Sequence, residues 1–183
     1  MPSRNPSESS VSATKHLPPY TRQQKWLHWI SAVVILWATV TGFMVVWMKP
    51  ANPWRQFIDN FNPQITTVLI PVFLWRMVVA VRETSRHPKS SLSLGARMAR
   101  YAHTSLYLFV TLVLASGALM MTHGVKLLGF IPLPQLIYST ATLDALFVLH
   151  RLFCLCLGAL IALHVAAVVK HALSGASVLK RMT

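Results

Sequence analysis

The sequence predicts an all-α membrane protein built as a four-helix transmembrane bundle. Of its 183 residues, 54% are hydrophobic and only 11% are charged, whereas soluble domains carry about 25% charged residues. The hydrophobic residues gather in long stretches, and a helix needs roughly 20 apolar residues to cross a bilayer. We expect four spans, at residues 26–48, 63–81, 102–122 and 142–170.

The predicted membrane domain covers residues 21–175. Residues 1–20 are rich in Ser and Pro and have no apolar run, so we expect a disordered leader that is not a signal peptide. The segment 49–62 is expected to be a loop, because Pro63 fits the first turn of the second span. Residues 176–183 form a short C-terminal tail.

Positive charge predicts the topology. The segments before the first span, between the second and third spans, and after the fourth carry 4, 5 and 3 Lys or Arg residues when Lys170, at the end of the fourth span, is counted with the tail; the other two loops carry three in total. Because positive residues stay on the cytoplasmic side, we expect both termini in the cytoplasm. A nucleic-acid-binding protein would place such charge on one soluble face, so nucleic acid is not an expected partner.

Two histidines of the fourth span, His150 and His164, point to a cofactor. They are fourteen residues apart, so they face nearly the same side of a helix, roughly 40° apart, at positions about 21 Å apart along it. Ionisable residues inside a membrane are costly and usually functional, and axial histidines are typical haem ligands. The alternative is that each imidazole simply hydrogen-bonds to a neighbouring helix.

The predicted topology sorts the histidines by depth. His28 begins the first span and lies at the same inner depth as His164, so these two side chains suit one haem with ligands on opposite faces. His103 begins the third span on the inner side, where it competes with His28 as a ligand or binds a haem propionate or a quinone. The outer His150 lacks an obvious partner, because His123 lies at or beyond the membrane boundary.

Other polar side chains inside the spans are harder to assign. Arg76 lies on the inner side, where it either pairs with a haem propionate or extends to the membrane surface. Arg151 lies beside His150, with the same choice. Cys154 and Cys156 are two residues apart on one helix, so they cannot bridge each other, and we expect inert thiols.

Several motifs together resemble one known family. They are RQQKWLHW at 22–29, WR at 75–76, AHTSLY at 102–107, SGALM at 116–120 and LHRLFCLCLGALIALHVAAVVKH at 149–171. Over residues 20–175 the chain resembles the bacterial cytochrome b561 family, which includes the cytochrome b subunits of nickel–iron hydrogenases. The resemblance implies a four-helix bundle in the bacterial inner (plasma) membrane that holds two b haems.

The resemblance also implies which side chains bind the haems. It implies that His28 and His164 ligate the inner haem, and that His150 ligates the outer haem together with a histidine near the start of the second helix. In this sequence the family's spacing from Arg76 leads to Asn62 at that position. Because asparagine is not a usual haem ligand, one haem b is expected and the second is in question: His150 holds a five-coordinate haem, takes His123 as its partner ligand, or binds no haem.

The leading interpretation is a membrane b-type cytochrome that transfers electrons between its haem and a quinone pool or a partner redox protein. We identify no catalytic residues, and leave open whether the carrier acts as an oxidoreductase towards quinone and whether it forms a homodimer. One alternative is a membrane anchor or assembly subunit of a redox complex that has partly lost haem binding. Another is a transporter that uses histidines as proton relays, but internal repeats and broken helices, typical of transporters, are not evident.

Overall fold

The computed structural model describes residues 21–86, 94–121, 126–127, 130–132 and 134–174, so the expected leader and tail lie outside the described residues. Its main elements are four long helices: α1 (Arg22–Met44), α2 (Pro53–Arg86), α3 (Leu94–Leu119) and α4 (Thr140–Leu173). All four are long and apolar enough to cross a membrane. This confirms the predicted four-helix membrane fold.

Two minor elements complete the described structure. A single 3-10 turn, η2 (Val45–Trp47), extends the end of α1. Between α3 and α4, the two-residue strands β1 (Lys126–Leu127) and β2 (Ile131–Pro132) pair in antiparallel fashion. These strands add a small β-ladder to the expected helices, outside the predicted spans.

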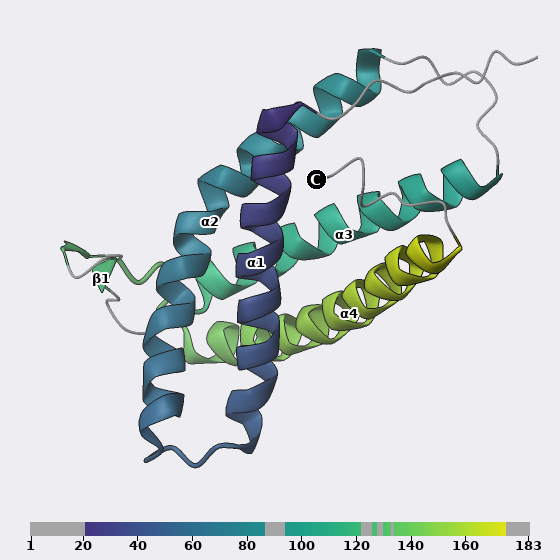
Figure 1. The fold of residues 1–183 in the computed structure, drawn as a ribbon. Helices are drawn as coiled ribbons and strands as arrows, with labels where there is room; N and C mark the ends of the chain where they lie inside the picture. The colour runs from purple at the N-terminus through teal and green to yellow at the C-terminus, as the bar shows by residue number, and fades with distance from the viewer. Residues whose placement is uncertain (1–20, 87–93, 122–125, 128–129, 133, 175–183) are drawn as a thin grey trace, which may run out of the picture.

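The helices form two antiparallel hairpins. Figure 1 shows α1 beside α2 as one hairpin, and α3 beside α4 as a second hairpin that lies across the first. Most contacts between helices fall within the pairs α1–α2 and α3–α4, and fewer join α2 to α3. Groups that lie between the hairpins therefore have neighbours from both halves of the chain.

The helix termini follow recognisable capping rules. Thr21 and Gln24 form a reciprocal capping box at the start of α1, which satisfies amide groups that lack a partner within the helix. At the start of α4, the Ser139 side chain accepts a hydrogen bond from the amide of Thr142. Both caps fix the start of a helix beside an apolar run.

The second helix begins earlier than predicted. Residues 53–62, which we expected in a loop, form the first turns of α2, so Pro63 lies inside the helix rather than in its first turn. The Asn52 side chain accepts a hydrogen bond from the Trp54 amide at 2.9 Å, and Pro53 is the first helical residue. An Asn cap followed by Pro favours a helix start. This signal explains why the segment is helical although its polar composition suggested a loop.

The small core joins the two hairpins. Its buried members come from α2, α3 and α4, and they are Leu69, Phe73, Val110, Leu114 and Leu157. In contrast, Leu155 and Leu163 of α4 are 58% and 68% exposed, which suits helix faces that contact lipid. The buried hydroxyls of Ser31, Thr41 and Ser116 each donate to a backbone carbonyl of the preceding turn, so none is left without a partner.

Candidate functional site

Each helix contributes one basic side chain to a cluster near the first turns of α1. We call His28, Arg76, His103 and His164 the histidine–arginine cluster; they come from α1, α2, α3 and α4 in turn. The charges of Arg76, His103 and His164 all lie close enough to act on the His28 imidazole. The sequence predicted these four residues as the inner site, and the structure brings them together.

Within this cluster, Arg76 holds one nitrogen of His28. Its Nη2 lies 3.0 Å from His28 Nδ1, and a guanidinium can only donate. His28 Nδ1 therefore accepts, and a neutral His28 carries its proton on Nε2. The Arg76 guanidinium also lies 5.2 Å from the centre of the Tyr107 ring, a cation–π distance that fixes the side chain from a second direction.

The other two histidines of the cluster lie against each other. The rings of His103 and His164 meet edge to face, with centroids 5.2 Å apart. His103 Nδ1 lies 2.8 Å from the Ala99 carbonyl oxygen, which can only accept, so a neutral ring has its proton on Nδ1, and its Nε2 has no hydrogen bond to any residue that the structure describes. Because their rings are in direct contact, His103 and His164 do not lie on opposite sides of a flat cofactor in this arrangement.

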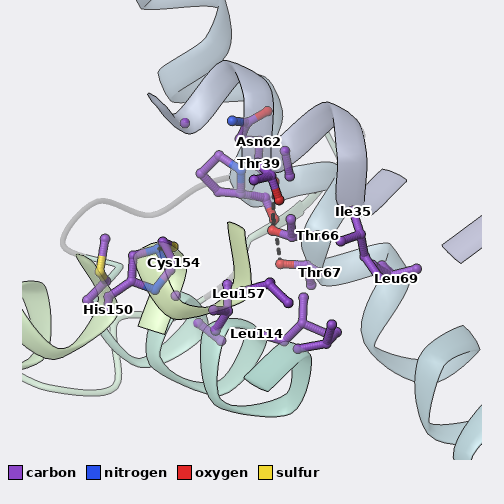
Figure 2. A pocket seen from close by; sticks show the side chains of 18 of the residues that line it. Ile35, Thr39, Asn62, Thr66, Thr67, Leu69, Leu114, His150, Cys154 and Leu157 are labelled. Carbon is purple, nitrogen blue, oxygen red and sulfur yellow. Dashed lines mark hydrogen bonds between the residues drawn. The ribbon is translucent and has the colours of Figure 1, made fainter. Parts of the chain in front are cut away.

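A second site lies further along the bundle, between the two hairpins. We call it the His150 cavity; its volume is about 270 Å³, near the lower end of the roughly 300–1,000 Å³ typical of ligand pockets. Its lining is mostly apolar, with His150, Cys154 and Asn62 among its polar members. Figure 2 shows His150 and Asn62 on different walls of the cavity.

The hydrogen bonds of His150 indicate which nitrogen of its neutral ring carries the proton. Ser116 Oγ lies 2.6 Å from the Leu112 carbonyl oxygen and 2.9 Å from His150 Nδ1. Because its single proton goes to the carbonyl, the Ser116 hydroxyl accepts from His150 Nδ1–H. The Nε2 lone pair of His150 then faces Cys154 Sγ at 3.4 Å, a weak donor. Ser116 and Cys154 are partners that the sequence reasoning did not assign.

Asn62 is held by α1 rather than left free in the cavity. Its Oδ1 accepts from Trp37 Nε1 at 3.1 Å, and its Nδ2 donates to Thr41 Oγ1 at 2.9 Å. Thr41 in turn donates to the Trp37 carbonyl at 2.7 Å. Asn62 therefore helps to join α2 to α1. The sequence analysis considered Asn62 only as the residue that replaces an expected histidine and did not predict this role.

The donor chemistry of both sites can be compared with what haem requires. The histidine–arginine cluster offers imidazoles from α1, α3 and α4 and a guanidinium for a propionate, so its donor types fit a bis-histidine haem. The His150 cavity offers one imidazole, whose Nε2 lies 3.4 Å from Cys154 Sγ. Gly42 lines the same cavity, and a Cβ added there meets no atom within 4 Å. The cavity therefore has open space over a helix backbone, but no second histidine among the residues that line it.

The remaining candidates have plainer surroundings. Arg151 is exposed and lies over the Phe147 ring at 5.5 Å, and no contact links it to the His150 cavity among the described residues. Within those residues, no group of three or more His, Cys, Asp or Glu side chains forms a metal site; axial haem ligation needs only two. His123 lies outside the described residues, so it stays untested as an outer ligand.

Four helices long enough to cross a membrane, which bring three histidines and an arginine together between them, define the class of helical membrane proteins with a site for a bound group inside the bundle. The family model of prokaryotic cytochrome b561 matches residues 19–183, and the chain belongs to that family. It is therefore a multi-pass membrane cytochrome of the b type, in a family that normally binds haem b and transfers electrons. A search among curated proteins found no match to this chain.

Proposed function

We propose that the chain carries electrons through a haem b that His28 and His164 ligate in the histidine–arginine cluster. The observation that carries this proposal is the convergence of one basic side chain from each helix, with His28 on α1 and the touching pair His103–His164 on α3 and α4. When bound, haem supplies one-electron chemistry. The protein's part is to ligate the iron, to exclude water and to set the local charge.

Ligation requires His28 to change its hydrogen bond. A neutral imidazole that gives its Nε2 lone pair to iron carries a proton on Nδ1, and Arg76 cannot accept that proton. Arg76 therefore turns from His28 Nδ1 and pairs with a haem propionate, for which its forked guanidinium is suited. His103 remains the alternative ligand to His28, or binds a propionate or a quinone, since its Nε2 has no hydrogen bond to any described residue.

The electron partner is a quinone in the bilayer or a partner redox protein. The many large apolar side chains exposed along the helices suit contact with lipid, which is where a quinone is dissolved. We further propose a bacterial inner membrane location, and leave a homodimer as an assembly to be tested. A membrane anchor with partly lost haem binding is the second candidate, and the presence of Asn62 at the position of the expected ligand favours it.

The optical spectrum of the purified protein tests the function directly. We expect a dithionite-reduced minus oxidised spectrum typical of low-spin, six-coordinate haem b, and reduction of that haem by a quinol or by a redox protein that reacts with it. The haem should extract into acidic acetone, because the chain has no CxxCH motif for covalent attachment. Protein that folds, inserts and stays free of haem after expression with sufficient haem supply would instead support the anchor.

Orientation is tested by fusions to the ends of the chain. With both termini in the cytoplasm, a C-terminal fluorescent reporter should be bright and a C-terminal alkaline phosphatase should be inactive, because positive residues stay inside. A phosphatase inserted into the loop between η2 and α2, near Ala51, should be active and serves as the control. The reverse pattern would contradict the proposed topology.

A further inference from the structure

The Arg76 guanidinium has an aromatic contact as well as its bond to His28. Its Cζ atom lies over the Tyr107 ring, 5.2 Å from the ring centre, within the range at which a cation is attracted to the face of an aromatic ring. Arg76 forms no salt bridge with a carboxylate among the described residues, although charges inside a protein are usually paired. The side-chain contacts that fix this charge are therefore His28 Nδ1 and the Tyr107 ring.

Tyr107 is itself held by the core. Its ring lies against Phe73, with ring centroids 5.7 Å apart, and Phe73 is only 2% exposed in the core that α2, α3 and α4 share. Phe73 and Arg76 are three residues apart on α2, so they are neighbours on the helix face that Tyr107 of α3 contacts. The Thr111 hydroxyl bonds to the Tyr107 carbonyl rather than to its phenol, so packing sets the position of the ring.

An aromatic face suits a cation that must change its partner. The proposed haem ligation requires the Arg76 guanidinium to leave His28 Nδ1 and to bind a propionate. The attraction between a cation and a ring face comes from the π electrons of the ring, and it occupies none of the five N–H donors of the guanidinium. The positive charge can therefore stay over the Tyr107 ring while its donors turn from one acceptor to the other.

We propose that Tyr107 is the positioning residue for Arg76: its ring keeps the guanidinium inside the histidine–arginine cluster when haem is bound, and in this way sets the midpoint potential. This inference rests on the proposed function, because the cluster has a midpoint potential only if it binds haem. The energy between two charges falls with their distance, so the ring acts by holding the positive charge near the iron. The plainer role for Tyr107 is to pack α2 against α3 through Phe73, and substitutions that keep the shape of the ring separate the two roles.

Fluorinated rings at position 107 test the aromatic face and leave its shape nearly unchanged. In the full-length protein, Tyr107→Phe keeps the face and should keep the midpoint potential close to the wild-type value. Phenylalanine analogues with one, two and three ring fluorines, incorporated at the same position, withdraw electrons from the face and weaken its attraction for a cation. We expect the midpoint potential to fall with each added fluorine, towards the value of Arg76→Gln. A midpoint potential that is the same across the series overturns the inference.

The same series in the Arg76→Gln background controls for any direct effect of the ring on the haem. If Tyr107 acts through Arg76, the midpoint potential in this background should not respond to fluorination, because the two changes are coupled and not additive. A fall of equal size in both backgrounds overturns the inference, since the ring would then act without Arg76. Tyr101→Leu changes an exposed tyrosine of the same helix and should leave the midpoint potential unchanged.

Tyr107→Leu extends the experiment to loss of the whole ring. Leucine keeps an apolar side chain against Phe73 but has no π face, so the midpoint potential should fall by most of the shift that Arg76→Gln produces, while the low-spin spectrum and the haem content are retained. If this variant does not accumulate, the fluorinated series still decides, because its members pack alike. Haem whose midpoint potential does not depend on the ring at position 107 overturns the inference and leaves the proposed function intact. Wild-type protein that folds and stays free of haem overturns both.

Discussion

His164→Ala is expected to abolish the low-spin haem signal of this cytochrome. The imidazole of His164 is proposed as one of two axial ligands, and a methyl side chain offers iron no lone pair. The haem content should fall by about one equivalent per chain, the number that one bis-histidine pair holds, with the α-band of the reduced spectrum lost. The measurement combines a haem assay with spectra of the oxidised and reduced protein.

The same experiment has controls within the chain. His171→Ala removes an exposed histidine one and a half to two turns further along α4, and it should leave the spectrum unchanged. His103→Ala separates the two inner candidates, because His103 lies against His164 rather than across from it. A low-spin spectrum that survives His164→Ala would remove His164 from the site, and one that is lost in His103→Ala but kept in His28→Ala would make His103 the ligand.

Arg76→Gln is expected to lower the midpoint potential of the haem in the histidine–arginine cluster. A positive charge near the iron stabilises the ferrous form, which carries one less positive charge. At about 10 Å and an effective dielectric constant of about 20, one charge contributes about 1.7 kcal/mol, which corresponds to about 70 mV for one electron. Potentiometric titration of the α-band measures this shift.

Arg76→Lys is the matched variant, since it keeps the charge but loses the forked donor geometry. It should hold the midpoint close to the wild-type value while loosening contact with the propionate and with Tyr107. Equal haem content in both variants would show that the difference is electrostatic. If Arg76→Gln leaves the midpoint unchanged, Arg76 does not act on the haem and extends to the membrane surface instead.

The sequence predicted the fold correctly where the prediction rested on long apolar stretches. Apolar stretches predicted four spanning helices, because the bilayer imposes a minimum length on any helix that crosses it. The prediction failed at the start of α2, where residues 53–62 are polar and aromatic, and only Asn52–Pro53 marks the helix start. The loop prediction for residues 49–62 relied on composition and did not use the capping signal of Asn52 and Pro53.

The sites show a similar division. Periodicity and depth selected His28, Arg76, His103 and His164, and the structure brings these four together. The contact of His150 with Cys154 follows from i, i+4 spacing on one helix, but its contact with Ser116 could not be read from periodicity, because it depends on how closely α3 and α4 approach at Gly117. Likewise, the spacing that led to Asn62 gave no sign of its bonds to Trp37 and Thr41, which depend on the register between α1 and α2.

The division into two hairpins bears on how the cytochrome matures. Each hairpin satisfies its own backbone and packs mainly within itself, so each can enter the bilayer as a unit soon after synthesis. The two candidate cofactor positions lie between the hairpins, where protein–protein contact is sparse. A haem bound between the hairpins would then stabilise the contact between two halves that are already inserted. Chains made when haem is scarce would keep only the sparse contacts between hairpins and would be more accessible to membrane proteases. Haem supply would in this way set the abundance of the protein as well as its activity.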